Sequence, residues 1–451
     1  MASTTPESQS QPALARTMGL WALVIYGVGD MLGSGIYALI GKAAGLMGNA
    51  VWLAFVVSMI AALFTGLSYA SLGSRYPRAA GAAYVAHRAF GFPLLTYVLG
   101  LSVVASGLTS FATQSRAFAG YFLGLTGWGP SATVLVALGF IAVLTFVNFW
   151  GMRESTALNV VCTTVEASGL LIVLLAGLRY WGSVDYLETP IQPNGMSGLS
   201  VGLVLQGGVL TFFSFVGFED MINVAEEVKN PRKNFPLAVV IALAFTTVIY
   251  IGISITAVSV VPYAELGHST QPLVDVVRKA APGFPPRAFS FIALFAIVNT
   301  GLLNYIMGSR LVYGLARQGF VPSFLGRIHR QRRTPHFAIL TLMCIVTLLA
   351  LSGGVAELAS ATSVLLLTAF IIVNGSLIAL KRRKDEPPGA FEIPSFIPAL
   401  GIVACAAMLL NAKGKSVLMA GLLLAVILVL YLVLRPKVVG EPELESDPSL
   451  D

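Results

Sequence analysis

A carboxylate and a Gly-Ser-Gly sequence lie near the middle of the first long apolar run of this chain, residues 18–44. The run is long enough for a helix that crosses a bilayer, which needs about 20 apolar residues. Asp30 and Gly33-Ser34-Gly35 do not suit an unbroken helix, because a charge at the bilayer centre costs about 2.5–3.5 kcal/mol and an interior glycine about 1 kcal/mol. Non-helical backbone survives in lipid only where protein buries it or where it lines a watery cavity. The sequence therefore predicts a helix that is interrupted near residues 33–35.

The half-helix that starts at Ser34 would point its first N–H groups into the protein. These groups have no carbonyl partner within the helix, and the helix dipole adds partial positive charge at the same end. Such a break is a ready anion site. The alternative is close helix packing through small residues, but packing gives no reason for Asp30. Residues 33–38 also match a loose dinucleotide fingerprint, which we discard because no strand precedes them.

Apolar residues dominate the whole chain. Of its 451 residues, 56% are hydrophobic and 11% are charged, whereas soluble domains carry about 25% charged residues. Apolar runs of about 20 residues indicate an all-α polytopic membrane protein with twelve transmembrane helices. The runs centre on residues 18–44, 50–73, 93–124, 132–150, 157–178, 200–224, 236–262, 286–315, 336–352, 355–380, 396–411 and 416–434.

The basic residues are distributed unequally between the two sides of the membrane. With the N-terminus inside, inner segments hold 20 of the 28 Lys and Arg, outer segments hold seven, and Arg116 lies within a span. The positive-inside rule then predicts that both termini are cytoplasmic. We expect a multi-pass protein of the plasma membrane, and the Ala-, Val- and Leu-rich spans favour a bacterial inner membrane. The net charge of +7 is thus a topology signal, and we expect no nucleic-acid partner.

A second interrupted span occurs five spans after the first. Gly217, Glu219 and Asp220 fall within the run 200–224. Glycine-interrupted segments at corresponding positions of two halves are the best sequence indication of a transporter binding site. The spacing predicts a 5+5 inverted repeat with broken helices 1 and 6 and two appended helices. The expected division is a cytoplasmic tail at 1–16, spans 1–5 at 17–180, spans 6–10 at 199–384, spans 11 and 12 at 395–435, and a cytoplasmic tail at 436–451.

Four stretches, in order and at matching spacing, resemble the amino acid–polyamine–organocation superfamily of transporters. They are residues 27–37, residues 66–70 with 73–84, residues 213–219 with 226–232, and residues 309–319. The last is similar to the pattern Ser-Arg-x-x-Tyr-x-x-Ala-Arg-x-Gly. The resemblance covers nearly the whole chain and is strongest to the cationic amino acid transporter branch and its bacterial proton-coupled relatives.

This resemblance implies where an amino acid substrate binds. The N–H groups of Ser34, Gly35 and Ile36 would take the α-carboxylate. Main-chain carbonyls around Phe213 and Val216, together with Met31, would hold the α-ammonium. Phe213 matches an aromatic gate that closes over substrate, although a packing role in a Phe-rich helix is the alternative. The implied substrate-binding residues are Met31, Gly33, Ser34, Gly35, Ile36, Phe213, Ser214, Phe215, Val216 and Gly217.

Three acidic residues are candidates for proton coupling. Glu219 matches an acid that is implicated in proton coupling or amino-group recognition. Glu166, the only charge of its span, stands where proton-coupled relatives carry a Lys, so its role here is open between proton transfer, cation binding and a structural contact. Asp30, where the family usually has a small or neutral residue, favours a cationic substrate or proton symport. Arg116 could instead neutralise one of these acids.

Other classes of function fit the sequence less well. The three cysteines and four histidines show no metal-like spacing, so we expect no metal, no cofactor and no catalytic residue, and hence no enzyme. A channel filter would need symmetric repeats of one short sequence, which the chain lacks. We expect a secondary active transporter of α-amino acids that works by alternating access, with the lipid bilayer around it and a proton, or alternatively sodium, as coupling ion. The alternatives are an exchanger, a polyamine or amine transporter on the same fold, and a non-transporting amino acid sensor.

Overall fold

The computed structural model of this protein describes residues 18–76, 81–151, 156–191, 198–317, 319–386 and 388–436. Some predictions lie outside these residues. They concern the tail 1–16, almost all of the tail 436–451, and several of the residues that set the topology, including Arg78 and Arg153.

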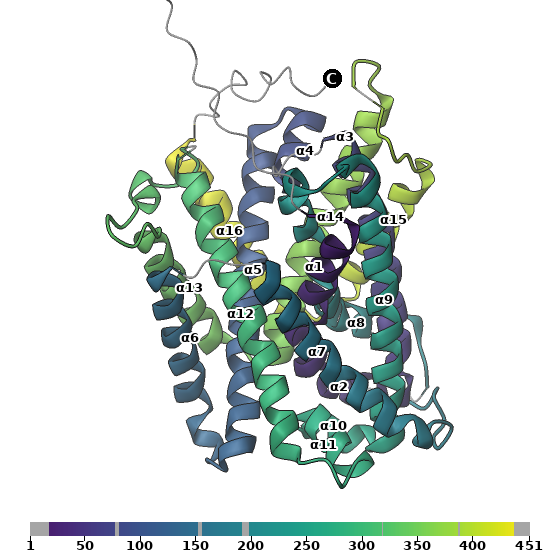
Figure 1. Ribbon diagram of the computed structural model, residues 1–451. Coiled ribbons are helices and arrows are strands. Elements are labelled where there is room, and N and C mark those ends of the chain that lie inside the picture. Colours follow the sequence, from purple (N-terminus) through teal and green to yellow (C-terminus); the bar gives the residue numbers. More distant parts are fainter. Residues whose placement is uncertain are drawn as a thin grey trace, which may run out of the picture.

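The described chain is almost entirely helical, and its long helices stand side by side in one bundle (Figure 1). The α-helices are α1 (Leu20–Leu32), α2 (Ser34–Met47), α3 (Val51–Arg75), α4 (Gly81–Phe90), α5 (Pro93–Thr126), α6 (Thr133–Trp150), α7 (Thr156–Gly177), α8 (Val201–Phe212), α9 (Pro231–Val260), α10 (Tyr263–His268), α11 (Pro272–Ala280), α12 (Pro286–Arg317), α13 (His336–Ser352), α14 (Val355–Arg382), α15 (Phe396–Leu410) and α16 (Gly414–Leu434). The short 3-10 helices are η1 (Gly48–Ala50), η2 (Pro130–Ala132), η3 (Leu178–Tyr180), η4 (Phe213–Phe215), η5 (Phe218–Glu227) and η6 (Ser323–Gly326).

Many of these helices are long and apolar enough to cross a membrane. Nine such stretches occur among the described residues, and the first of them, Leu20–Arg75, contains α1, α2 and α3. Two further apolar helices, α13 and α15, are shorter. Each of the twelve apolar runs of the sequence is helical over most of its length. The protein is therefore a multi-pass helical membrane protein, whereas the number of crossings stays a prediction.

Both predicted helix interruptions are confirmed. The first run divides at Gly33, which separates α1 from α2. The second run leaves the α-helix after Phe212, continues as η4, becomes extended at Val216 and resumes as η5. The chain thus has non-helical backbone within both of the segments where the sequence placed a glycine beside a carboxylate.

The long helices α5 and α12 pack against each other and run through the bundle beside the breaks (Figure 1). Helix α5 has 34 residues, so it measures about 51 Å at 1.5 Å per residue, well beyond the roughly 30 Å of bilayer hydrocarbon.

The buried hydroxyls of α5 mostly donate hydrogen bonds within the helix. Thr109 and Thr113, for example, donate to carbonyls four residues earlier, which lets polar side chains lie in an apolar bundle.

Backbone hydrogen bonds join the start of the first interrupted segment to the end of the second. Met18 N–H, just before α1, donates to the carbonyl of Glu227 at 2.9 Å, and Lys229 N–H donates to the carbonyl of Met18 at 2.8 Å. These bonds form a short parallel bridge between Met18 and Val228. At the opposite end of the bundle, where α10 and α11 lie (Figure 1), Lys42 of α2 donates to the carbonyl of Gly267 at 2.8 Å.

The connection from α14 to α15 is tied to the ends of α3 and α4 by two buried or half-buried acids. Glu392 pairs with Arg75 of α3 and, at 2.9 Å, with Lys381 of α14. Glu386 accepts hydrogen bonds from Arg88 of α4 at 2.9 and 3.0 Å and from the Tyr76 hydroxyl at 2.6 Å. The connection therefore holds the end of the bundle that carries α4, which we call the α4 end.

We predict that Glu392→Gln loosens this connection in a pH-dependent manner. Burial raises the pKa of the Glu392 carboxyl, but hydrogen bonds from Lys381 and the Gly389 N–H, together with the charge of Arg75, outweigh it and hold the pKa below its ordinary value. A lowered pKa means that the carboxylate stabilises the fold above its unfolded pKa of about 4.3 and loses this effect as the pH falls through the folded value.

Hydrogen exchange measured by mass spectrometry tests the prediction. At pH 7 the segment from Gly389 to Ile393 should exchange faster in Glu392→Gln than in the unaltered protein, while α10 and α11 should be unchanged. Because the Glu392 side chain is about 35% exposed, the effect on global stability should be well under ~1 kcal/mol. A difference that persists undiminished at the lowest pH at which the protein stays folded would contradict the ion-pair explanation.

Candidate functional site

A small polar cavity lies between the two helix breaks. Its volume is about 20 Å³, little more than one water molecule occupies. It is enclosed by residues of α1, α2, α5, η4, η5 and α12 and by the Val216-Gly217 link. These residues are Asp30, Met31, Ser34, Gly35, Ser110, Gln114, Phe213, Val216, Gly217, Asp220, Thr300 and Asn304.

The cavity gathers seven of the predicted site residues. Met31, Ser34, Gly35, Phe213, Val216, Gly217 and Asp30 line it. Of the others, Gly33 is the N-cap of α2, and Ile36 is buried in its first turn. Ser214 and Phe215 are buried in η4 next to the lining residues, whereas Glu219 and Glu166 are buried outside the lining.

The start of α2 is directed at η4 and α12. The Ser34 N–H donates to the Thr300 hydroxyl at 3.1 Å, and that hydroxyl donates in turn to the carbonyl of Ala296 at 2.9 Å. Gly35 lies so close to η4 that a Cβ atom at this position would be 2.6 Å from the Cα of Ser214. The first turn of α2, with N–H groups that no helical carbonyl can accept from, therefore faces the second break directly.

A tyrosine of α9 joins the carbonyl ends of both breaks. The hydroxyl of Tyr250 bonds to the carbonyl of Met31, at the end of α1, and to the carbonyl of Ser214 in η4 at 2.7 Å. The ring of Tyr250 packs between Phe55 and Phe215, with centroid distances of 5.6 and 5.1 Å. Tyr250 thus supplies a donor to backbone oxygens that the interruption of the helices leaves unpaired.

Gly217 has a backbone conformation and a location that both require glycine. Its φ is +127°, and a Cβ atom there would be 2.9 Å from the Cγ of Asp30. The Gly217 N–H donates to a carboxylate oxygen of Glu219 at 2.9 Å. Glu219 therefore stabilises the second break although its side chain does not line the cavity. Its neighbour Asp220, which is not among the predicted site residues, does line the cavity.

Glu166 of α7 is fully buried between α2 and α12. One carboxylate oxygen accepts a hydrogen bond from Asn299 at 2.9 Å, and the other has no hydrogen-bond partner among the described residues. The backbone carbonyl of Glu166 accepts a bond from the Tyr37 hydroxyl at 2.8 Å. Arg116 donates to the carbonyl of Ala350 on α13 at 2.6 Å and does not line the cavity.

Sequence reasoning missed the residues that α5, α9 and α12 bring to the site. Ser110 and Gln114 are four residues apart on α5, and Thr300 and Asn304 are four residues apart on α12, so each pair shares one helix face. Polar residues at this spacing within two apolar runs are a signal that could have identified both pairs. Nothing in the local sequence around Tyr250 indicates its role.

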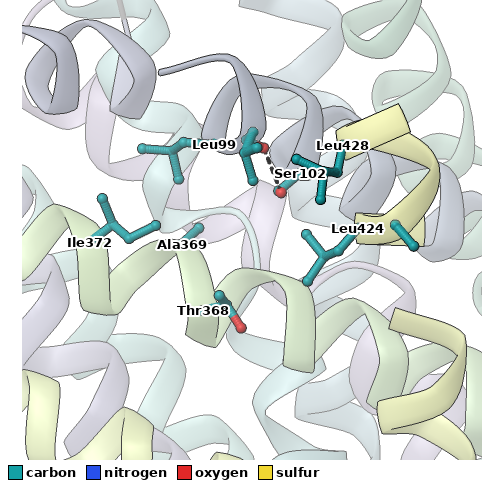
Figure 2. A pocket seen from close by; sticks show the side chains of 9 residues that line it. Leu99, Ser102, Thr368, Ala369, Ile372, Leu424 and Leu428 are labelled. Atoms are coloured by element: carbon teal, nitrogen blue, oxygen red, sulfur yellow. Dashed lines mark hydrogen bonds between the residues drawn. The ribbon is translucent and has the colours of Figure 1, made fainter. Parts of the chain in front are cut away.

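A larger hollow between α5, α14 and α16 is apolar (Figure 2). Its volume is about 270 Å³. Its two hydroxyls, Ser102 and Thr368, donate to carbonyls of their own helices at 2.6 and 2.8 Å. The hollow is lined by Val98, Leu99, Ser102, Thr368, Ala369, Ile372, Leu424, Ala425 and Leu428. It presents no polar group that could orient a charged substrate, so the small cavity is the candidate site.

Comparison with known proteins identifies similar transporters. Residues 18–434 match the family model described as amino acid permease. The chain is 26% identical to a branched-chain amino acid permease of Bacillus subtilis (strain 168) over 444 residues, which is 94% of each chain. It is 30% identical to cationic amino acid transporter 9, chloroplastic, of Arabidopsis thaliana over 350 residues, covering 72% of this chain and 59% of the relative. It is also 27% identical to a methylthioribose transporter of Bacillus subtilis (strain 168) over 419 residues, covering 89% and 88%.

We predict that Gly35→Ala weakens amino acid binding. The added methyl group would meet the backbone of Ser214, which cannot yield without moving η4 away from α2. Gly139→Ala on α6 is the matched control, because a Cβ atom there has nothing within 4 Å. Titration calorimetry on the folded fraction should show affinity at least about tenfold lower for Gly35→Ala and unchanged for Gly139→Ala. Equal affinities in both variants would exclude the close contact of α2 and η4 from the binding site.

We predict that Tyr250→Phe destabilises the protein by about 1–3 kcal/mol, because the two buried carbonyls share the single Tyr250 O–H as donor and lose it while the ring contacts remain. Tyr97→Phe is the control, since the buried Tyr97 hydroxyl has no partner among the described residues. Thermal unfolding in detergent, followed by tryptophan fluorescence, should show a lower midpoint for Tyr250→Phe alone. Equal midpoints for the two variants would mean that Tyr250 does not support the breaks.

Proposed function

This chain belongs to the amino acid permease family of the amino acid–polyamine–organocation superfamily, and we propose that it moves α-amino acids across the membrane by alternating access. The members of this family are transporters and not enzymes. The observation that carries the proposal is the polar cavity between two interrupted helices, where helix ends of opposite polarity meet. An amino acid has opposite charges on its two main-chain groups, and such a pair of helix ends is complementary to them.

The substrate carboxylate would bind at the first turn of α2, to the N–H groups of Ser34, Gly35 and Ile36. Thr300 occupies the first of these groups, so the carboxylate would replace or share its hydroxyl. The α-ammonium would bind the carbonyls of Met31, Phe213 and Val216, where Tyr250 already supplies a donor to Met31. The buried hydroxyls of Ser34 and Ser214 have no partner among the described residues, which supports a ligand at this place.

A cavity of about 20 Å³ is too small for any amino acid, so the site would have to widen to admit a substrate. Opening would require the segments around the breaks to move relative to α5 and α12. The bridge between Met18 and Val228 joins the start of the first segment to the end of the second and supports their movement as one body. Phe213 would be the gate. The proposed architecture has twelve spans, with an inverted repeat at 17–180 and 199–384, and both termini and the α4 end are cytoplasmic.

Glu166 is our first candidate for proton coupling, with Glu219 as the second. A buried carboxyl group with one unpartnered oxygen can carry a proton on that oxygen and release it when the surroundings change. One carboxylate oxygen of Glu166 has no hydrogen-bond partner among the described residues, which supports this role. The other oxygen bonds to Asn299 of α12, a helix that lines the cavity. One carboxylate oxygen of Glu219 accepts a hydrogen bond from the Gly217 N–H in the second break, so its proton exchange would affect the shape of the break.

We predict that Glu166→Gln abolishes proton-driven accumulation of substrate. The double variant Glu166→Gln/Glu219→Gln removes both candidate proton carriers and tests them together. In proteoliposomes with an inward proton gradient, the accumulation ratio of a labelled amino acid should fall to about one, because no proton enters the cycle. Exchange in preloaded vesicles should persist, since it needs no net proton movement. Glu357→Gln is the control, because Glu357 pairs with the exposed Lys415 at 3.5 Å.

Other outcomes of the same assay decide between the alternatives. Accumulation that needs sodium and resists protonophore would make sodium the coupling ion. Uptake only into preloaded vesicles would identify an exchanger and leave Glu166 with a structural role. Binding without any uptake would identify a sensor, and preferred uptake of a polyamine would identify an amine transporter. Undiminished proton-driven uptake by the double variant would overturn the assignment of both acids.

A further inference from the structure

We propose that the site selects amino acids whose side chain carries a hydroxyl or carboxamide group, through Ser110, Gln114 and Asn304. This inference rests on the proposed function and concerns the substrate class of the same site. The three relatives do not agree on a substrate, because their names indicate branched-chain amino acids, cationic amino acids and methylthioribose. The substrate class must therefore come from the side chains that line this cavity.

The three residues form one connected polar group on α5 and α12. The Gln114 amide donates to the Ser110 hydroxyl at 3.2 Å, and the Asn304 amide donates to the same hydroxyl at 3.4 Å. Both distances exceed the usual 2.9–3.0 Å of such bonds. All three residues line the cavity. Residues of α1, α2 and η4, the elements that would hold the main-chain groups of the substrate, line the same cavity.

Part of the hydrogen-bonding capacity of this group is unused. A buried Gln amide can make three or more hydrogen bonds. The residue Gln114 is 1% exposed, yet its Oε1 atom has no partner among the described residues. Ser110 accepts twice in the bonds above, which leaves its O–H as a donor. Neighbouring α5 hydroxyls differ, since Ser106 donates to the carbonyl of Val103 at 2.7 Å. Unpaired buried polar groups cost free energy, and a substrate that pairs them removes that cost.

The chemistry of the group favours a neutral polar side chain. Hydroxyl and carboxamide groups both donate and accept, as Ser110, Gln114 and Asn304 do. A cationic side chain would need a counter-charge on this wall, where the lining residues of α5 and α12 are all uncharged. The acids of the cavity, Asp30 and Asp220, come from α1 and η5 and already have interactions of their own. An aliphatic side chain would leave the Oε1 atom of Gln114 without a partner.

Uptake of threonine and valine by the purified protein in proteoliposomes tests the inference, because the two side chains have the same shape and differ in one hydroxyl. Threonine uptake should exceed valine uptake by at least about tenfold in kcat/KM, and asparagine should exceed leucine likewise. In Ser110→Ala the threonine-to-valine ratio should fall by about fivefold or more. Ser106→Ala is the matched control, on the same helix with its hydroxyl bonded within the helix, and should keep the unaltered ratio.

The outcomes separate this inference from the proposed function. Uptake of valine, leucine or arginine at or above the level of threonine by the unaltered protein would overturn the substrate class and leave amino acid transport standing. The same fall of the ratio in Ser106→Ala and Ser110→Ala would also overturn it. No uptake or exchange of any amino acid would overturn the proposed transport and this inference with it. The comparison within the unaltered protein does not depend on the folding of any variant.

Discussion

Backbone groups that leave the helix inside a membrane must find partners within the protein, and most of this structure follows from that requirement. Lipid offers no hydrogen bonds, so each interrupted helix exposes N–H and C=O groups that are costly to leave unpaired. Here the Tyr250 hydroxyl bonds to carbonyls of both breaks, and the Thr300 hydroxyl accepts from the start of α2. Two side chains from α9 and α12 thereby stabilise a backbone conformation that the apolar bundle alone would not permit.

The same requirement explains why the polar residues cluster. The breaks need buried partners, and the cavity between them is lined by hydroxyls, amides and carboxylates in a chain that is 56% hydrophobic. Outside this cluster, most of the buried hydroxyls described here bond to carbonyls of their own helices, as in Thr109 and Thr247. Three of the buried polar atoms that have no partner among the described residues lie at or next to this cavity: the hydroxyls of Ser34 and Ser214 and the Oε1 atom of Gln114.

The two ends of the bundle differ in how they are held. At the α4 end, charged side chains from α3, α4, α14 and the loop after it form ion pairs around Glu386 and Glu392. At the other end, α10 and α11 pack on the bundle, Lys42 bonds to a backbone carbonyl, and Glu357 at the start of α14 pairs with the exposed Lys415. The basic residues that predict orientation also make these ion pairs, so the positive-inside signal and the packing of the α4 end depend partly on the same side chains.

The sequence by itself determined the helices, the two interruptions and most of the residues at the first break. Hydropathy and glycine placement are local properties, and bilayer thickness converts them into helix lengths. The sequence could not show that Asp220 rather than Glu219 lines the cavity, that Glu166 bonds to Asn299, or that Tyr250 joins both breaks. Those facts depend on the rotation of each helix about its axis and on contacts between residues up to 219 positions apart. Only tertiary packing decides them, because a shift of one residue along a helix turns a side chain by about 100° toward a different neighbour.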